Sequence, residues 1–132
     1  MNTFWDTSAM VALLLQEPGT AAARSVWKNS SQPWAWRWLV IETESALSRR
    51  RATAAAWNQW RSAMGAIRLL DLHPDQWDTL RAFNRGLRRR ASDAAHLFVF
   101  ERASTVIPDL QLVTLDDEMK DGAQQLGLAL AG

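Results

Sequence analysis

The chain contains no cysteine, only two histidines and only two lysines. The absence of cysteine excludes a disulfide framework and any thiolate metal site, and it fits a reducing compartment. No apolar stretch reaches the length of a membrane span, and no basic segment leads into a long apolar run at the N-terminus. We therefore expect a protein with no signal peptide and no membrane partner that works in the cytoplasm.

The composition is that of an ordinary globular domain. Hydrophobic residues make up 48% and charged residues 22% of the chain, so we expect a packed core. The length of 132 residues suits one domain over 1–132, without internal repeat, low-complexity tract or linker. The net charge of +1 conceals an uneven distribution, because seven arginines fall in two short segments, 49–51 and 85–90.

Apolar segments of strand length alternate with helical patterns along the whole chain. Strands are predicted over residues 2–5, 34–36, 67–70, 110–114 and 128–131. Helices are predicted over residues 9–16, 20–28, 38–51, 53–64, 73–85, 94–103 and 119–126, and Gly86 is expected to end the fifth of them. This alternation predicts an α/β fold, a three-layer α/β/α sandwich around a central, mainly parallel sheet of about five strands.

Four acids occupy positions where such a fold can do chemistry. Asp6 directly follows the first strand and Asp116 lies just beyond the fourth, at the strand ends where open α/β sheets bind ligands. Asp93 lies in the first turn of an apolar helix, where the helix dipole favours an anion. Glu42 lies within a helix, on the face that also carries Arg49. Each acid also has a structural alternative, because the three aspartates can cap helices and Glu42 can pair with an arginine.

Together the four acids supply only hard oxygen ligands, which suit Mg²⁺ or Mn²⁺ rather than zinc. Without a metal, clustered carboxylates repel one another, and at least one of them should have a raised pKa. Ser8 can orient a ligand or a metal-bound water. His96, one turn beyond Asp93 on a strongly apolar helix, is interpreted as a packed, hydrogen-bonded side chain rather than a catalytic group. Glu44 and Asp117 are interpreted as surface charge or capping residues.

Four segments, in order along nearly the whole chain, resemble the motifs of PIN-domain nucleases, and especially of VapC-type toxins. They are Asp6-Thr7-Ser8-Ala9 after a short strand, Glu42 to Arg50, Ser92-Asp93-Ala94-Ala95-His96-Leu97, and Thr114-Leu115-Asp116 before a helix. The resemblance implies a three-layer α/β/α fold and an Mg²⁺- or Mn²⁺-dependent endoribonuclease. The catalytic and metal-binding acids would be Asp6, Glu42, Asp93 and Asp116, with Ser8 and Thr114 in support. In many relatives it also implies a homodimer and a cognate antitoxin, as in a type II toxin–antitoxin pair.

The arginines and tryptophans are each open to a functional and a structural interpretation. The guanidinium fork matches phosphate oxygens, so we predict that Arg49, Arg50, Arg89 and Arg90 bind RNA beside the acids. The alternative is that they are solvated helix ends. Tryptophan can stack on unpaired bases, but we favour core or interface positions for the eight tryptophans. Any that are exposed would suit a dimer or an antitoxin groove.

Alternatives to the toxin interpretation remain open. A PIN-fold nuclease can process RNA without an antitoxin, and a non-catalytic domain that binds nucleic acid or protein can keep the acids as caps. A receiver-like phosphoacceptor domain also places aspartates at strand ends, but it needs a lysine in a later strand, and only Lys28 and Lys120 exist.

Asp116 rather than Asp117 is predicted to face the site, because successive helical side chains are rotated by about 100°.

Overall fold

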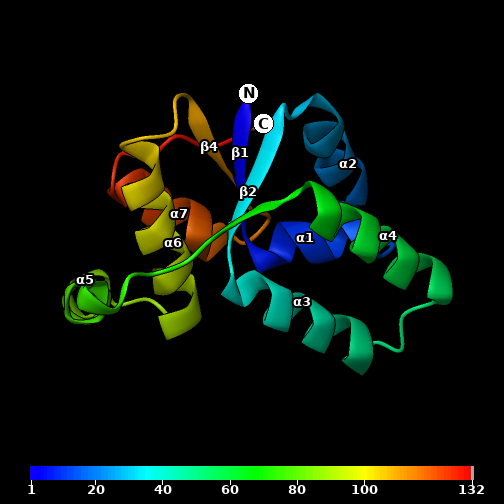
Figure 1. Cartoon of the computed structure of the whole chain (residues 1–132), viewed down its shortest axis with the longest axis horizontal. Helices are drawn as coiled ribbons and strands as arrows, with labels where there is room; N and C mark the ends of the chain where they lie inside the picture. The colour runs from blue at the N-terminus through cyan, green and yellow to red at the C-terminus, as the bar shows by residue number, and fades with distance from the viewer. Residues whose placement is uncertain (132) are drawn as a thin grey trace.

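The computed structural model describes residues 1–131, which form a four-stranded parallel sheet between two groups of helices (Figure 1). The strands are β1 (Asn2–Trp5), β2 (Gln32–Trp36), β3 (Arg68–Leu70) and β4 (Leu110–Val113), in the order β3-β2-β1-β4. The helices are α1 (Thr7–Leu14), α2 (Thr20–Asn29), α3 (Trp38–Arg49), α4 (Ala54–Ala66), α5 (Trp77–Leu87), α6 (Ala91–Ser104) and α7 (Asp117–Gln125). The predicted three-layer α/β/α fold is confirmed. No helix within residues 1–131 is long and apolar enough to cross a membrane.

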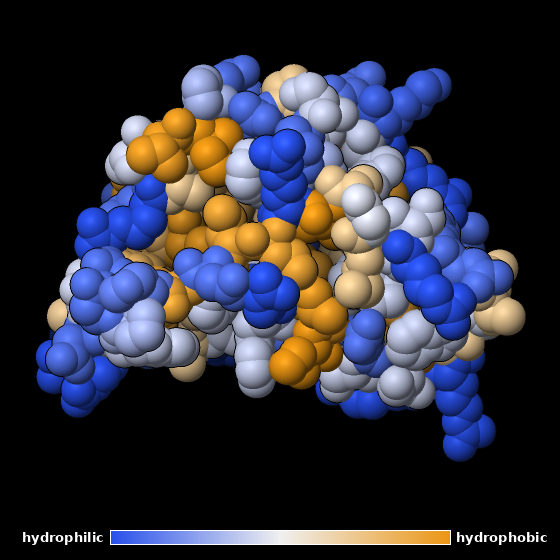
Figure 2. Space-filling view, viewed as in Figure 1, coloured by the Kyte–Doolittle hydropathy of each residue, from blue (hydrophilic) through white to orange (hydrophobic). Residues whose placement is uncertain are grey.

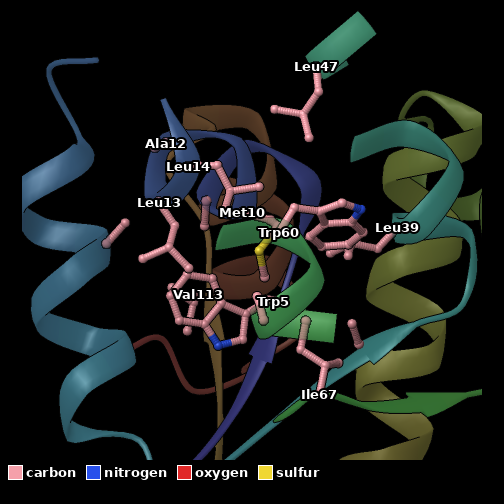
Figure 3. Close-up of a cluster of buried hydrophobic side chains, with 14 residues drawn as sticks. Trp5, Met10, Ala12, Leu13, Leu14, Leu39, Leu47, Trp60, Ile67 and Val113 are labelled. Carbon is pink, nitrogen blue, oxygen red and sulfur yellow. The ribbon is translucent and has the colours of Figure 1, made fainter. Parts of the chain in front are cut away.

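Adjacent strand residues supply two separate cores, one on each face of the sheet. Trp5 of β1 packs against α1, α2, α3 and α4, whereas the neighbouring Phe4 packs against α6 and α7. Figure 3 shows the first core, in which Trp5 and Trp60 of α4 lie close to Met10 of α1. Complete burial of a side chain such as Phe4 stabilises a fold by about 1.5–3 kcal/mol. The period-2 alternation in β1 therefore fixes which helices cover which face.

The predicted fifth strand is reduced to a single bridge. Leu130 pairs with Leu112 of β4 in the parallel direction. The backbone of Leu112 donates to the Ala129 carbonyl and accepts from the Ala131 N–H. The segment therefore covers the outer edge of β4 and adds an edge contact to the four strands, close to the five that were predicted.

Helix α5 differs from its predicted bounds at both ends. Its first residues instead form a 3-10 turn, η1 (Pro74–Gln76), and the α-helix begins at Trp77. The prediction that Gly86 ends this helix is wrong. The helix continues to Leu87, and Arg88 then adopts the left-handed conformation that terminates it, with φ of 59°.

The carboxyl ends of β1, β2 and β4 meet at one edge of the sheet because all the strands run parallel. Trp5 is in register with Val113, and the backbone N–H of Asp6 donates to the Val113 carbonyl at 3.1 Å. Asp6 and Thr114 therefore leave the sheet side by side. This is the edge at which open α/β sheets bind ligands.

Candidate active site

A pocket of about 230 Å³ lies at this edge and brings together the four predicted acids. Asp6 comes from the junction of β1 and α1, Glu42 from α3, Asp93 from the first turn of α6, and Asp116 from the start of α7. The residues that line the pocket are Asp6, Thr7, Ser8, Glu42, Arg90, Ser92, Asp93, His96 and Asp116. Four separate elements thus deliver one carboxylate each to a single pocket.

The carboxylate of Asp6 is the most enclosed of the four, with 3% of the residue exposed. Asp6 is also the N-cap of α1, because Oδ1 accepts from the backbone N–H of Ala9 at 3.1 Å. Burial raises the pKa of Asp6, and hydrogen bonds from Thr114, Ala9 and Ser8 offset part of the rise. The structural and functional interpretations of Asp6 are therefore compatible, since a cap can also line the pocket.

The two supporting residues predicted from the sequence both bond to Asp6. The Ser8 hydroxyl donates to Oδ1 of Asp6 at 2.8 Å and accepts from the backbone N–H of Leu115 at 3.0 Å. The Thr114 hydroxyl donates to Oδ2 of Asp6 at 2.5 Å and accepts from the backbone N–H of Asp116 at 3.1 Å. These two hydroxyls join the β1–α1 junction to the loop between β4 and α7, and so fix the spacing between Asp6 and Asp116.

Glu42 is held by two donors from different elements. The Thr7 hydroxyl donates to its Oε1 at 3.0 Å, and Nε2 of His96 lies 2.7 Å from the same oxygen. Burial acts to raise the pKa of Glu42, but the hydrogen bonds from His96 and Thr7 outweigh it, and the pKa is lowered. The interpretation of His96 as a packed, hydrogen-bonded side chain is confirmed, since only 2% of the residue is exposed. Its partner is an acid of the candidate site.

The pKa of Asp93 shows the effect of bringing the acids together in one pocket. Burial first, and then the negative charges of Asp116 and Asp6, raise its pKa above the ordinary value, and the charge of Arg90 offsets only part of the rise. This meets the expectation that at least one clustered carboxyl has a raised pKa. Asp116 is also the N-cap of α7, because its Oδ1 accepts from the backbone N–H groups of Glu118 and Met119. Asp117 is absent from the pocket lining.

The four arginines predicted to bind RNA have different surroundings. Arg90 lines the acid pocket, and Arg49 lines an adjoining groove that shares Thr7 and Glu42 with that pocket. Arg50 forms an ion pair with Glu17. Arg89 is 19% exposed at its side chain and donates to Asp121 at 2.6 Å. Arg49 and Arg90 are therefore the two whose positions fit phosphate binding directly.

The donor chemistry of the pocket fits a hard divalent cation. The four carboxylates supply only oxygen, and the pKa of Asp93 is raised by burial and then by the charges of Asp116 and Asp6, a repulsion that a cation would relieve. However, no group of three or more His, Asp or Glu side chains within the described part of the chain is spaced to hold a metal ion without rearrangement. Binding of a cation would require the pocket carboxylates to converge further.

Three features of the pocket were not predicted from the sequence. Thr7 and His96 bond to Glu42, and Arg90 lines the pocket rather than only flanking it. The spacing of three between Asp93 and His96 places both on one helix face and is a signal for the contact of His96 with Glu42.

Glu44, interpreted as surface charge or a cap, instead accepts a 2.9 Å hydrogen bond from the indole of Trp60 and links α3 to α4.

A family comparison agrees with this arrangement. The model of the PIN domain family matches residues 3–124, a range that includes all four acids. The chain belongs to the PIN domain family. Membership supports a nuclease. No curated protein matches this PIN domain.

Solved structures share the fold of this PIN domain. VapC20 of Mycobacterium tuberculosis, described as a toxin that cleaves the sarcin-ricin loop, superposes with a TM-score of 0.72 at 19% sequence identity, covering 90% of this chain and 93% of VapC20. PAE2754 of Pyrobaculum aerophilum superposes with a TM-score of 0.68 at 22% identity, covering 92% of this chain and 84% of that protein. At these identities the likeness establishes the fold.

Proposed function

We propose that this PIN domain is an Mg²⁺- or Mn²⁺-dependent endoribonuclease and the toxin of a type II toxin–antitoxin pair. The observation that carries the proposal is the pocket of Asp6, Glu42, Asp93 and Asp116, four acids from four elements at the carboxyl edge of a parallel sheet. A purely structural set of helix caps would not place Glu42, which lies in the body of α3, beside the three aspartates.

Hydrolysis of a phosphodiester requires an activated water and stabilisation of the negative charge that develops on oxygen. A bound divalent cation supplies both. Asp93, Asp116 and Glu42 would hold the cation together with Asp6. Asp6 itself is kept in place by three hydrogen bonds, and its burial excludes bulk water from that end of the pocket. Arg90 supplies a positive charge at the same pocket for a phosphate oxygen.

RNA would approach along the groove that adjoins the pocket. The groove is lined by Arg49 and Ser45 and shares Thr7 and Glu42 with the pocket, so a strand bound there leads directly to the acids. Arg49 would contact a phosphate of that strand. An antitoxin would compete by inserting an acidic or carboxylate group between the same arginines and the acids. Because RNA and an antitoxin are both found in the cytoplasm, we propose that the protein works there.

We propose that the homodimer forms through the apolar patch of Trp38, Ile41, Met64 and Trp77. All four side chains are exposed, Trp38 by 48% and Trp77 by 51%, and they line one hollow. Figure 2 shows hydrophobic side chains in the middle of this face, between α5 and α6 on one side and α3 and α4 on the other. The Arg37–Asp71 ion pair lines the same hollow. Because this ion pair is satisfied within the chain, it leaves no unpaired charge in the hollow, and the same patch on a second copy could pack against it across a two-fold axis.

Purified protein tests the catalytic proposal. It should cut RNA internally with Mg²⁺ or Mn²⁺, stop cutting in excess chelator, and resume when the ion is restored. The matched control is Asp93→Asn prepared in parallel, which should be folded and inactive. Cutting that persists in chelator, or that is equal in the Asp93→Asn protein, would show that these acids do not form the active site.

The toxin proposal needs a separate test, because an RNA-processing PIN nuclease would also cut RNA. A toxin gene should lie beside a small upstream reading frame that encodes a DNA-binding N-terminus and an amphipathic tail. Expression of the chain alone should arrest growth, and co-expression of that neighbour should restore it. Cleavage of RNA without growth arrest would favour the RNA-processing alternative.

A further inference from the structure

His96 is a buried polar side chain whose hydrogen bonds connect α6 to the site acid of α3. Its Nε2 lies 2.7 Å from Oε1 of Glu42 and 3.5 Å from the Thr7 hydroxyl, and 2% of the residue is exposed. The residues that follow it along α6, from Leu97 to Phe100, are also buried. An imidazole in such a place needs a partner, and the partner here is a carboxylate that lines the candidate active site.

The hydrogen on His96 can be assigned from its two nitrogens. An ionised carboxylate only accepts, so Nε2 must carry the hydrogen that it shares with Glu42. Nδ1 is buried, and no residue in the described range 1–131 hydrogen-bonds to it. Through Nε2, His96 therefore acts on Glu42 as a hydrogen-bond donor.

The two donors restrict where the Glu42 carboxylate can go. Both His96 and Thr7 bind Oε1, which leaves Oε2 as the oxygen free to take a ligand in the pocket. Arg49 lies on the same face of α3 and lines the groove that shares Glu42 with the pocket. Without the bond from His96, a half-buried Glu42 has an alternative partner in Arg49, and that pairing would draw the carboxylate out of the pocket.

We propose that His96 is a positioning residue, which holds Oε1 of Glu42 against α6 so that the remaining oxygen serves the active site and does not pair with Arg49. The proposal rests on the proposed function, because it concerns an acid of that site. His96 itself touches neither substrate nor the reacting atoms. We therefore predict that metal binding and RNA cleavage depend on the N–H donor at Nε2 and not on the imidazole ring itself.

Two variants distinguish the effect of the hydrogen-bond donor of His96 from the effect of its volume. His96→Gln retains an N–H donor near the position of Nε2, and His96→Leu fills similar volume without one. Loss of an outer-shell partner typically costs about 10- to 100-fold in metal affinity or activity. We expect His96→Leu to lower kcat and weaken Mn²⁺ binding by about that much, with little change in KM for RNA. His96→Gln should recover most of both losses.

The decisive measurements need no RNA. Calorimetric titration with Mn²⁺ reports ion binding directly, and nitrogen NMR of the metal-free protein distinguishes the Nε2–H form of His96 from the Nδ1–H form. A double-mutant cycle adds Glu42→Gln. Because His96 acts through Glu42, the His96→Leu change should weaken Mn²⁺ binding in the wild-type background and have little further effect beside Glu42→Gln.

The outcomes distinguish failure of this inference from failure of the proposed function. If the wild-type protein binds Mn²⁺ and cuts RNA but His96→Leu does both equally well, His96 is a core residue and the inference is overturned. Additive losses in the cycle, or a hydrogen found on Nδ1 and not on Nε2, would overturn it as well. If the wild-type protein does not cut RNA at all, the proposed function fails. The predicted Nε2–H form and the Mn²⁺ cycle then still decide whether His96 positions Glu42.

Discussion

One hydroxyl, that of Thr114, joins the carboxylate at the end of β1 to the backbone that follows β4. It donates to Oδ2 of Asp6 at 2.5 Å and accepts from the N–H of Asp116 at 3.1 Å. Thr114→Val keeps the shape and removes both bonds. Because Asp6 and Thr114 are buried, we expect the free energy of unfolding to fall by about 1–3 kcal/mol. RNA cleavage should fall by about 10-fold or more, as for loss of an outer-shell partner. Denaturant titration and cleavage rates provide the measurements.

Thr114→Ser is the matched control for this change, since it restores the hydroxyl and loses only a methyl group. It should retain most of the activity and stability. Equal damage by serine and valine would mean that the methyl packing matters and that the bond to Asp6 does not.

The arginine run at the end of α3 offers a test of RNA binding with an internal control. Arg49 lines the groove beside Glu42, whereas Arg50 is engaged with Glu17. Arg49→Ala should weaken RNA binding and flatten its salt dependence by about 0.7–0.9 units of slope, the value for one phosphate contact. Arg50→Ala should change the slope little. Binding isotherms at several salt concentrations measure both, and an unchanged slope in Arg49→Ala would return Arg49 to the solvated-face interpretation.

The apolar patch predicts an oligomeric state. Trp77→Glu places a charge on the patch, so it should convert a homodimer to a monomer in light scattering after gel filtration, while circular dichroism shows that the variant remains folded. Val106→Glu is the control, because Val106 is 78% exposed and lies outside the patch. If the wild-type protein is monomeric when alone, the patch is open for the antitoxin instead.

The fold was predicted well from the sequence because the patterns that indicate strands and helices involve residues close together in the chain. Alternation such as that of Phe4 and Trp5 is set by strand geometry, and each of the three aspartates could be placed at a strand end or helix start without knowledge of its neighbours. Helix ends were less predictable. Gly86 was expected to stop α5, but Arg88 performs that role in a left-handed conformation that few non-glycine residues adopt.

The hydrogen bonds that connect the pocket residues could not be predicted from the sequence. The bonds of His96 and Thr7 to Glu42 depend on how α6 and α3 pack across the β1–α1 junction. The separate environments of Arg49 and Arg50 likewise depend on Glu17, which lies far from them in the sequence. Such contacts are tertiary: spacing within α6 could place His96 on the face of Asp93, but it could not show that the partner of His96 is Glu42.

Asp93 predicts an unusual pH dependence of stability in the metal-free protein. Its pKa is raised above 3.8 by burial and by the charges of Asp116 and Asp6. The folded state therefore binds more protons than the unfolded state just above pH 3.8, and this residue makes the fold less stable as the pH rises through that window. In chelator, Asp93→Asn should melt at a higher temperature than the wild-type protein at pH 7, and the difference should vanish near pH 3. An equal gain at both pH values would exclude repulsion as the cause. The variant should not cut RNA.

Asp116 and Asp117 give the sharpest test of which acid completes the site. Asp116 lines the pocket and uses Oδ1 to cap α7 through the N–H groups of Glu118 and Met119. Asn caps a helix about as well as Asp, so Asp116→Asn should leave the melting temperature nearly unchanged. It removes a charged ligand, so cleavage should fall and the Mg²⁺ or Mn²⁺ concentration needed for half-maximal activity should rise. Asp117→Asn removes the same charge one residue later, outside the pocket lining, and should leave cleavage close to wild type. If Asp117→Asn is the damaging change and Asp116→Asn is silent, the acid that completes the site is Asp117.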